Sequence, residues 1–374
     1  MRLISGSCGH ELFWICVFLS ALGTLKVILA LLCWAMSLPL LLIQPAAQGF
    51  TDAALLTFLA ILLLSMVRLR RQSLLILLAL MTIGWLILPQ LPSVDQVRQA
   101  GSFVLIFACL LPTLTLVRAT ALTMPSVLDT QTRLGQLPPQ NSASGLQLAS
   151  HVLGGVMNIG AFALIASSLP QTAGFERRRV AAEAALRGMN GAVVWSPFFI
   201  SFAVAGIYLP PGFAFGAIGL GVITAVLFFF ISSALAAPAG ARFAVLDALR
   251  PLQPILPRLL IAIIAVIIMS AVTGLTALFA VVTTMPLLCL VQMCRRPQTA
   301  RPIVKQFWSL QKSSGDELVI ISASMLIASL AADTSSLSAL MDGLFGQVPE
   351  VWLRTPPLWL LCWTSCLASG QRCG

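Results

Sequence analysis

The sequence predicts an all-α polytopic membrane protein with about nine to eleven transmembrane or re-entrant helical segments. The first reason is composition: 59% of the 374 residues are hydrophobic and only 9% are charged, whereas a soluble chain carries about 25% charged residues. The second reason is that the apolar residues form continuous runs along the whole chain, while a membrane β-barrel would show alternation. These observations exclude a water-soluble protein and predict helices that cross a lipid bilayer.

The apolar runs follow one another with short polar breaks. They span residues 27–43, 53–67, 74–88, 102–117, 146–169, 191–209, 212–236, 259–291, 318–332 and 351–363. A shorter run at 12–22 is either an extension of the first or a separate interfacial helix. Residues 259–291 suffice for two short spans with a break near Thr273 and Gly274, and residues 119–145 are expected to be irregular. Several runs are shorter than the ~20 residues of a straight span, which is typical of broken helices in transporters.

Lysine and arginine predict the orientation of the spans. The chain has 22 Lys and Arg against 12 Asp and Glu, a formal net charge of +10, and such an excess collects in the cytoplasmic loops of membrane proteins. We therefore expect a multi-pass protein of the plasma (bacterial inner) membrane with a cytoplasmic N-terminus. The segments expected on the cytoplasmic side are 68–71, 177–187, 242–258 and 295–312.

The arginines at 177–187 conflict with a simple count of crossings. They follow the run 146–169, which itself follows a cytoplasmic loop, so a single crossing would place them outside. A hairpin that enters and leaves on the same side would keep them inside, with Gly154 and Gly155 at its tip. We expect such a re-entrant element within 146–201, and an ordinary span that breaks the charge rule is the alternative.

Two polar segments, 176–189 and 302–311, have the pattern of short amphipathic helices at the membrane surface. Each precedes an apolar segment with small residues and serine, and this order suggests two related halves, arranged as inverted repeats with interrupted helices. We therefore divide the chain into N-terminal hydrophobic segments at 1–52, a first half at 53–236 and a second at 237–374. Because its last apolar run is short, the second half is either truncated or frame-shifted, or it ends in a naturally short helix.

The segment RGMNGAVVWSPFFISF, residues 187–202, carries candidate substrate contacts. Pro197 removes a helical donor and frees backbone carbonyls, while Asn190 and Ser196 offer side-chain hydrogen bonds beside the flexible Gly191. Helix ends and exposed backbone groups of this kind bind ions and anionic substrates in carriers. The alternative is a proline kink whose serine satisfies the freed carbonyl.

A second candidate segment is DELVIISASMLIASLAADTSS, residues 316–336. Ser322 and Ser324 are candidate substrate contacts within it. Asp333 is the candidate group for the coupling ion or proton, because acids embedded in a membrane are functional candidates by default. The alternative is that Asp333 caps the next helix from the interface.

Two further places combine polar groups with an apolar context. Thr273 and Gly274 can open an unwound turn that contacts substrate, or they are small residues for close helix packing. His151 can relay protons, or it is a structural histidine at a helix end. We expect either a carrier role or a packing role for each.

The residues of most catalytic chemistries are missing. The sequence has no HExxH, GxSxG or P-loop motif, and its acids are few and mostly near the ends of the apolar segments, so we expect no enzyme and no ATP-driven transport. Most of the nine cysteines lie in apolar runs and are expected to be small hydrophobes, with no metal site and no cofactor. No basic run is interleaved with aromatic residues, so we expect no nucleic-acid partner.

The order of the segments along the chain resembles that of the ion-transporter superfamily, which includes citrate, dicarboxylate and arsenite carriers. The positions that correspond to the two substrate-site segments of that superfamily hold RGMNGAVVWSPFF and DELVIISASMLIASLAAD. The chain resembles this superfamily over about residues 53–363. The superfamily's Ser-Asn-Thr signature is absent from both segments, so the resemblance does not identify the substrate or the coupling ion. The resemblance implies a secondary carrier with an elevator-like moving part. We expect a small anion as its substrate, an organic acid or inorganic oxyanion, with coupling to protons or sodium and assembly as a homodimer. A non-transporting assembly or scaffold subunit is the alternative.

Overall fold

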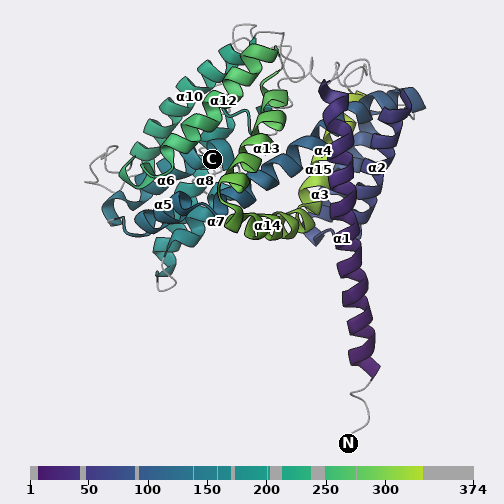
Figure 1. Ribbon diagram of the computed structural model, residues 1–374, viewed down its shortest axis with the longest axis horizontal. Coiled ribbons are helices and arrows are strands. Elements are labelled where there is room, and N and C mark those ends of the chain that lie inside the picture. The colour runs from purple at the N-terminus through teal and green to yellow at the C-terminus, as the bar shows by residue number, and fades with distance from the viewer. Residues whose placement is uncertain are drawn as a thin grey trace, which may run out of the picture. The chain divides into compact units, whose positions relative to one another are not determined.

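The protein is helical throughout the part of the chain that the structure describes (Figure 1). The computed structural model describes residues 7–42, 48–88, 92–137, 139–157, 159–169, 173–199, 201–202, 213–236, 249–274 and 276–331. Within these ranges no strand is present. The predicted all-α class is therefore confirmed.

The described residues fall into two compact units. Unit 1 holds those of 1–115 and 304–331, and unit 2 holds those of 116–303. The helices of unit 1 are α1 (Ser7–Leu42), α2 (Gln48–Met66), α3 (Arg71–Ile87), most of α4 (Val94–Leu122), most of α14 (Ala300–Ser313) and α15 (Gly315–Ala331). The helices that lie wholly in unit 2 are α5 (Pro125–Gly135), α6 (Pro139–Met157), α7 (Ile159–Ser168), α8 (Phe175–Val193), α10 (Phe213–Ala236), η1 (Arg250–Leu252), α12 (Leu256–Thr273), α13 (Ala277–Arg295) and η2 (Pro297–Thr299). The predicted division of the sequence into halves stays a prediction.

Six of the described helices are long and apolar enough to cross a membrane, namely α1, α2, α4, α10, α12 and α13. A seventh span results if α14 and α15, bent by 54° at a short break, are counted as one. The apolar helix α3 has only 17 residues. The chain is therefore a polytopic membrane protein, while the expected total of nine to eleven segments stays a prediction.

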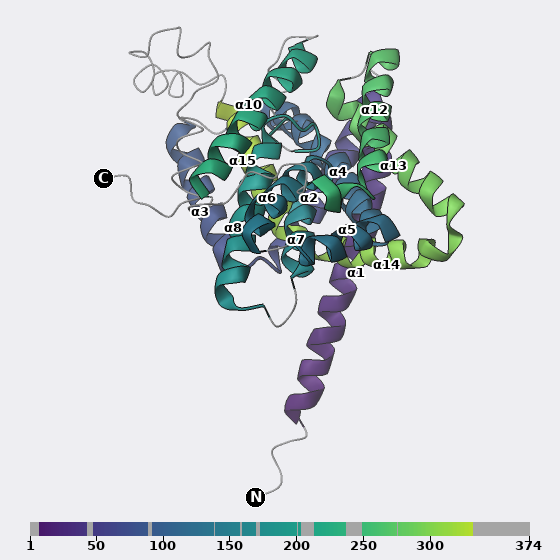
Figure 2. The same cartoon turned by 90° about the vertical axis from the view of Figure 1, so that its left-hand side faces the viewer.

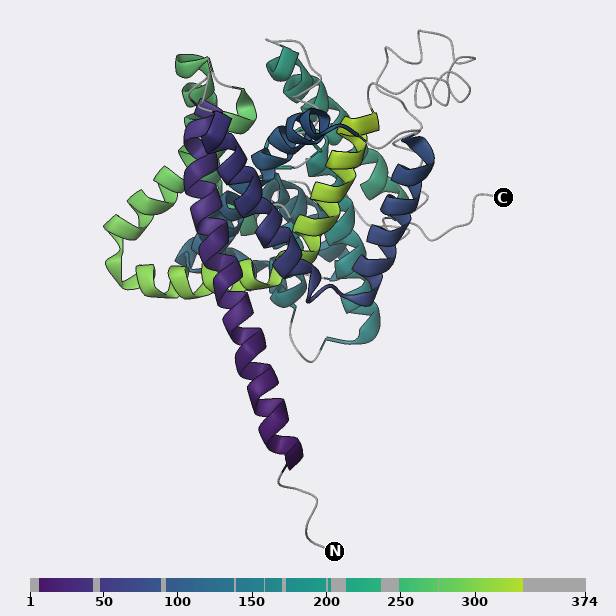
Figure 3. The same ribbon diagram turned by 90° about the vertical axis from the view of Figure 1, so that its right-hand side faces the viewer.

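Unit 1 is held together by helices that are distant in the sequence. Helices α1 and α2 lie side by side, and α15 packs against α2 and α3 (Figure 3). Gly84 of α3 permits one of these approaches, because a Cβ there would lie 3.2 Å from Ile327 of α15. The apolar run at 12–22 joins the next run in the single helix α1, so it is an extension and not a separate helix.

Unit 2 is centred on a close contact between α6 and α8 (Figure 2). Alanines 181, 184 and 185 of α8 are almost completely buried, and Ser150 of α6 donates a hydrogen bond to the carbonyl of Ala185 at 2.6 Å. A Cβ at Gly188 would lie 2.1 Å from the carbonyl oxygen of Gln147. Small residues therefore bring the two backbones together, as in tightly packed membrane helices.

The expected hairpin tip at Gly154 and Gly155 is wrong. Helix α6 continues through both residues to Met157, and α7 begins at Ile159. Both glycines instead provide space: a Cβ at Gly155 would lie 2.8 Å from the Trp195 ring. A span that starts at residue 191 is also wrong, because α8 continues to Val193 and turns follow it.

The expected irregular stretch at 119–145 is wrong as well. It contains the end of α4, all of α5 and the start of α6. Prolines in this stretch favour a prediction of irregular structure, but proline is also favoured in the first turn of a helix. Pro125 and Pro139 each begin a helix. The segments 176–189 and 302–311 are helical as predicted, as parts of α8 and α14. Their location at the membrane surface stays a prediction.

The predicted break in the run 259–291 is confirmed. Helix α12 ends at Thr273, and Gly274 follows with φ of 68°, the left-handed conformation that ends many helices. The Gly274 N–H donates to the carbonyl of Ser270 at 3.0 Å. Helix α13 then begins at Ala277, so the two helices form a hairpin.

The orientation prediction can be tested by labelling single cysteines on a cysteine-free background. Arg178 is exposed on α8, and a cysteine there is expected to react with a membrane-impermeant maleimide only from the cytoplasmic side. Asp95 lies between the apolar runs 74–88 and 102–117, one crossing after the cytoplasmic segment 68–71, so it is expected outside. Its side chain is 89% exposed, and a cysteine in its place is the matched control, expected to react from outside. External labelling at position 178 would contradict the cytoplasmic placement of 177–187.

Candidate functional site

A cavity of about 210 Å³ in unit 1 gathers basic side chains from three parts of the chain. It lies where α1 meets the turn between α2 and α3 and the break between α14 and α15. Its charged lining residues are Lys26, Arg68, Arg70, Lys312 and Asp316. Arg68 and Arg70 of the segment 68–71 and Lys312 thus line one cavity in unit 1, although they are far apart in the sequence.

Lys26 is the most enclosed of these cations. It lies inside the candidate span of α1, and the residue is only 7% exposed. Its Nζ donates a hydrogen bond to the carbonyl oxygen of Lys312 at 2.7 Å. Because an ammonium has three hydrogens, two N–H donors remain beyond the one that bonds Lys312, and Lys26 lines the cavity.

The broken pair α14–α15 forms another wall of the cavity. Helix α14 ends at Ser313 and α15 starts at Gly315, with a bend of 54° between them. The first N–H groups of α15 and the positive end of its dipole therefore lie at the cavity. Gly315 allows this closeness, since a Cβ there would lie 3.2 Å from Nζ of Lys26 and 3.3 Å from Ser65.

Positive charge exceeds negative charge around this space. Among the described lining residues, Asp316 is the one carboxylate, and it is already engaged. Its Oδ2 accepts a hydrogen bond from Ser73 at 2.9 Å and lies 3.5 Å from Nε of Arg70. Asp316 offsets one positive charge, that of Arg70, and the charges of Lys26, Arg68 and Lys312 remain. The cavity therefore has the charge and size to hold a small anion.

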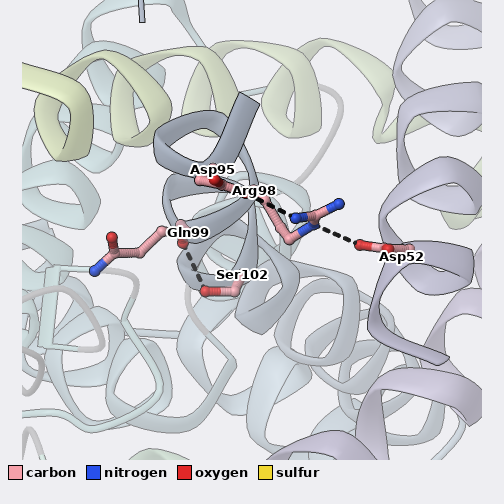
Figure 4. Close-up of polar contacts among 5 residues, drawn as sticks. All are labelled: Asp52, Asp95, Arg98, Gln99 and Ser102. Carbon is pink, nitrogen blue, oxygen red and sulfur yellow. Dashed lines mark hydrogen bonds and ion pairs between the residues drawn. The ribbon is translucent and has the colours of Figure 1, made fainter. Parts of the chain in front are cut away.

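The opposite end of α2 carries a different arrangement (Figure 4). Arg98 of α4 donates to Asp52, in the first turns of α2, and to Asp95, each at 2.9 Å. Its one positive charge is therefore shared by two carboxylates. This cluster ties α2 to α4 and has no excess positive charge that would attract an anion.

Four predicted substrate contacts lie in unit 2, at or beside the interface of α6 and α8. Asn190 is half-buried and Gly191 is buried, both within α8, and Ser196 and Pro197 are buried in the turns after it. The Ser196 hydroxyl donates to the carbonyl of Gly155 and accepts from the N–H of Phe198. The serine thus joins α6 to the turn after α8, and substrate binding by these residues stays a prediction.

The predicted proton group His151 belongs to the same cluster. A Cβ on Gly191 would lie 3.0 Å from its Nδ1. Its Nε2 accepts a hydrogen bond from Nε1 of Trp195 at 3.2 Å, so the neutral ring carries its hydrogen on Nδ1, 3.3 Å from the carbonyl of Gly188. Helix α6 is not among the candidate spans. Burial lowers the pKa of His151 below its usual value, against a smaller opposite effect of the Gly188 bond.

The remaining predicted residues are scattered. Thr273 and Gly274 are exposed at the tip of the α12–α13 hairpin, where the Thr273 hydroxyl donates to the carbonyl of Met269 at 2.6 Å. Ser324 bonds back to Ile321 at 2.9 Å. Ser322 is buried in α15, two turns from Gly315, and its hydroxyl has no partner among the described residues. Asp333 lies outside the described residues.

The cavity's cations were not among the predicted site residues. In the sequence alone, Arg68 and Arg70 indicate only the orientation of the spans. The signal that could have found Lys26 is its position between two apolar runs that form one helix, because a charge inside a membrane span is expensive and is a functional candidate.

Comparisons with protein families, with characterised proteins and with solved structures find no match for this chain. Within the described ranges, no group of three or more His, Cys, Asp and Glu side chains could hold a metal ion.

The environment of His151 predicts that unit 2 loses stability in acid. A histidine whose folded pKa is lowered stabilises the fold above its unfolded pKa of about 6.5, and this contribution is lost as the pH falls through that value. Thermal unfolding of the purified protein is expected to shift downward between about pH 7.5 and about pH 5.5. The shift should shrink in His151→Gln but persist in His10→Gln, the other histidine. Equal shifts in wild type and His151→Gln would contradict the prediction.

Proposed function

We propose that the protein is a secondary active transporter that moves a small anion, an organic acid or an inorganic oxyanion, across the plasma membrane. Transport is coupled to a proton or sodium gradient. The observation that carries this proposal is the cationic cavity at the break between α14 and α15. Its residues Lys26, Arg68 and Lys312 form the anion site.

Three physical features of the cavity support an anionic substrate. Charge-assisted hydrogen bonds from lysine and arginine to anions are about twice as strong as neutral ones. The start of a helix adds backbone donors and a favourable dipole. Transporters place such broken helices at their binding sites, with the N-terminal ends directed at anionic groups. A volume of about 210 Å³ is below the 300–1,000 Å³ typical of drug-sized ligands, which favours a small substrate.

The cluster around His151 and Ser196 is a separate place in unit 2. Both ring nitrogens of His151 are hydrogen-bonded, so a role in proton coupling requires that the bond to Trp195 opens. Within this proposal, we expect His151 or Asp333 to couple anion transport to the ion gradient, and we expect membership of the ion-transporter superfamily. We also propose that the chain is not an enzyme.

The test is uptake by proteoliposomes that contain the purified full-length chain. Radiolabelled phosphate, sulfate, succinate and citrate are offered in turn, with and without an imposed proton or sodium gradient. We expect saturable uptake of at least one anion, stimulated by one gradient and abolished by the matching ionophore. Organic cations and neutral sugars of similar size are the controls and are expected to remain outside.

Absence of flux for the whole anion panel, from protein that is folded and inserted, would contradict the proposal. It would favour the alternative of a membrane assembly or scaffold subunit. A separate binding measurement distinguishes the two parts of the proposal. Binding of an anion without flux would support the anion site and contradict the carrier function.

A further inference from the structure

A second cavity, of about 250 Å³, lies in unit 2 beside the α12–α13 hairpin. The two helices run antiparallel from the turn at Gly274, so Arg258 in the first turn of α12 and Arg295 at the end of α13 lie at the same, open end of the hairpin. Both arginines line the cavity. Since both helices are candidate spans, this end lies at one boundary of the membrane.

The cavity extends from this boundary into the depth of one leaflet. Met285 lines it ten residues before Arg295, which is about 15 Å along a helix. This depth is about half of the ~30 Å hydrocarbon core of a bilayer. Leu259, Ala262 and Val127 are further buried lining residues, and the deep part of the cavity is apolar.

Charge at the mouth of the cavity has one sign. The described lining residues include two arginines and no carboxylate. The arginine side chains are exposed, and the bond from Arg258 to the carbonyl of Pro254 is long, at 3.5 Å. The mouth is thus complementary to an anion, whereas the interior is complementary to a hydrocarbon chain.

We infer that this cavity binds an anionic phospholipid. The phosphate lies between Arg258 and Arg295 at the membrane boundary, and one acyl chain enters the apolar part beside Met285. A free phosphate would leave that apolar part empty, and a zwitterionic lipid gains less from the two arginines because its own cation opposes them. Basic pockets between membrane helices bind anionic lipid headgroups through this combination of charge and depth.

The experiment measures lipid retention by the purified full-length protein with native mass spectrometry. Phosphatidylglycerol and phosphatidylcholine with identical acyl chains are offered together, and soluble glycerol phosphate is added as a competitor. The wild-type protein is expected to retain phosphatidylglycerol at least tenfold better than phosphatidylcholine. Excess glycerol phosphate is expected to leave the bound lipid in place, because it lacks the acyl chain.

Two variants remove different halves of the site. Arg258→Gln with Arg295→Gln removes the charges, and Ala262→Trp fills the apolar part without changing charge. Each is expected to lower phosphatidylglycerol retention at least tenfold. Arg296→Gln is the matched control, since Arg296 lies next to Arg295 but does not line the cavity, and it is expected to retain the lipid as the wild type does.

Three results would overturn the inference. Equal retention of the two lipids by the wild type would show that the arginines select nothing, and this result does not depend on any variant. Displacement of phosphatidylglycerol by glycerol phosphate would show a headgroup site without a chain. Undiminished retention in folded Ala262→Trp and in the double arginine variant would place the lipid elsewhere.

Discussion

Replacement of Lys26 by methionine is expected to weaken anion binding by about ten- to a hundredfold. The exchange keeps an unbranched side chain that is one heavy atom shorter, and it removes the charge from the most enclosed position of the cavity. A lost hydrogen bond between charged groups costs about 1.5–3 kcal/mol, and 1.4 kcal/mol corresponds to a factor of ten. Apparent affinity from concentration-dependent uptake, with the anion that the wild type transports, measures the effect.

The matched control is Lys305→Met, the same exchange on the exposed side of α14, away from the cavity. It is expected to leave the affinity unchanged. Because Lys26 also bonds the carbonyl of Lys312, its replacement could disturb the end of α14. Arg68→Gln therefore serves as a second variant, since Arg68 lines the cavity from an exposed turn. Wild-type affinity in both folded variants would exclude the cavity as the anion site.

The second large effect is expected for Gly188→Ala, which should destabilise the α6–α8 pair. The added Cβ would lie 2.1 Å from the carbonyl oxygen of Gln147 and 2.9 Å from the backbone nitrogen of His151. Neither backbone atom can turn aside as a flexible side chain would, so the helices must separate. Overpacking of a dense interface typically costs 1–3 kcal/mol. Thermal unfolding in detergent, followed by tryptophan fluorescence, should begin several degrees lower.

Gly216→Ala is the control for this effect. It places the same methyl group on helix α10, where, apart from the adjoining backbone of the helix and the two neighbouring residues, nothing lies within 4 Å of the added carbon. Alanine is favoured over glycine in a helix by up to about 1 kcal/mol, so this variant is expected to be as stable as the wild type or slightly more stable. If Gly188→Ala unfolds together with the wild type, α6 and α8 are not as close as the structure has them.

The helices of this protein could largely be predicted from the apolar runs, because a membrane helix is defined by local composition. The hairpin turn at Gly274 could also be predicted, since glycine alone readily adopts the left-handed conformation that ends a helix there. Gly154 and Gly155 show the limit of this reasoning. A glycine pair serves equally for a reversal and for close packing, and only the partner helix decides which.

The cationic cavity could not be predicted because its parts are brought together by tertiary packing. Lys26 and Lys312, which share a hydrogen bond, are 286 residues apart, and Ser73 and Asp316 are 243 apart. A single sequence contains no distance between such residues. A serine that interrupts an apolar run can contact a substrate or can link two backbone segments. Ser196 has this local pattern, and its hydroxyl bonds the backbone of α6.

The excess positive charge of the cationic cavity has an electrical consequence for the proposed carrier. Four cationic groups face one carboxylate there, so the unoccupied site of a carrier would bear about three positive charges. If the site moves through the membrane potential during transport, each uncompensated charge that crosses the full field changes the energy by about 2.3 kcal/mol per 100 mV. Movement of the empty site would therefore depend strongly on voltage, and a bound anion would offset part of its charge. A carrier with such a site is expected to exchange anions faster than it takes them up in one direction, and the one-way flux should respond more steeply to voltage.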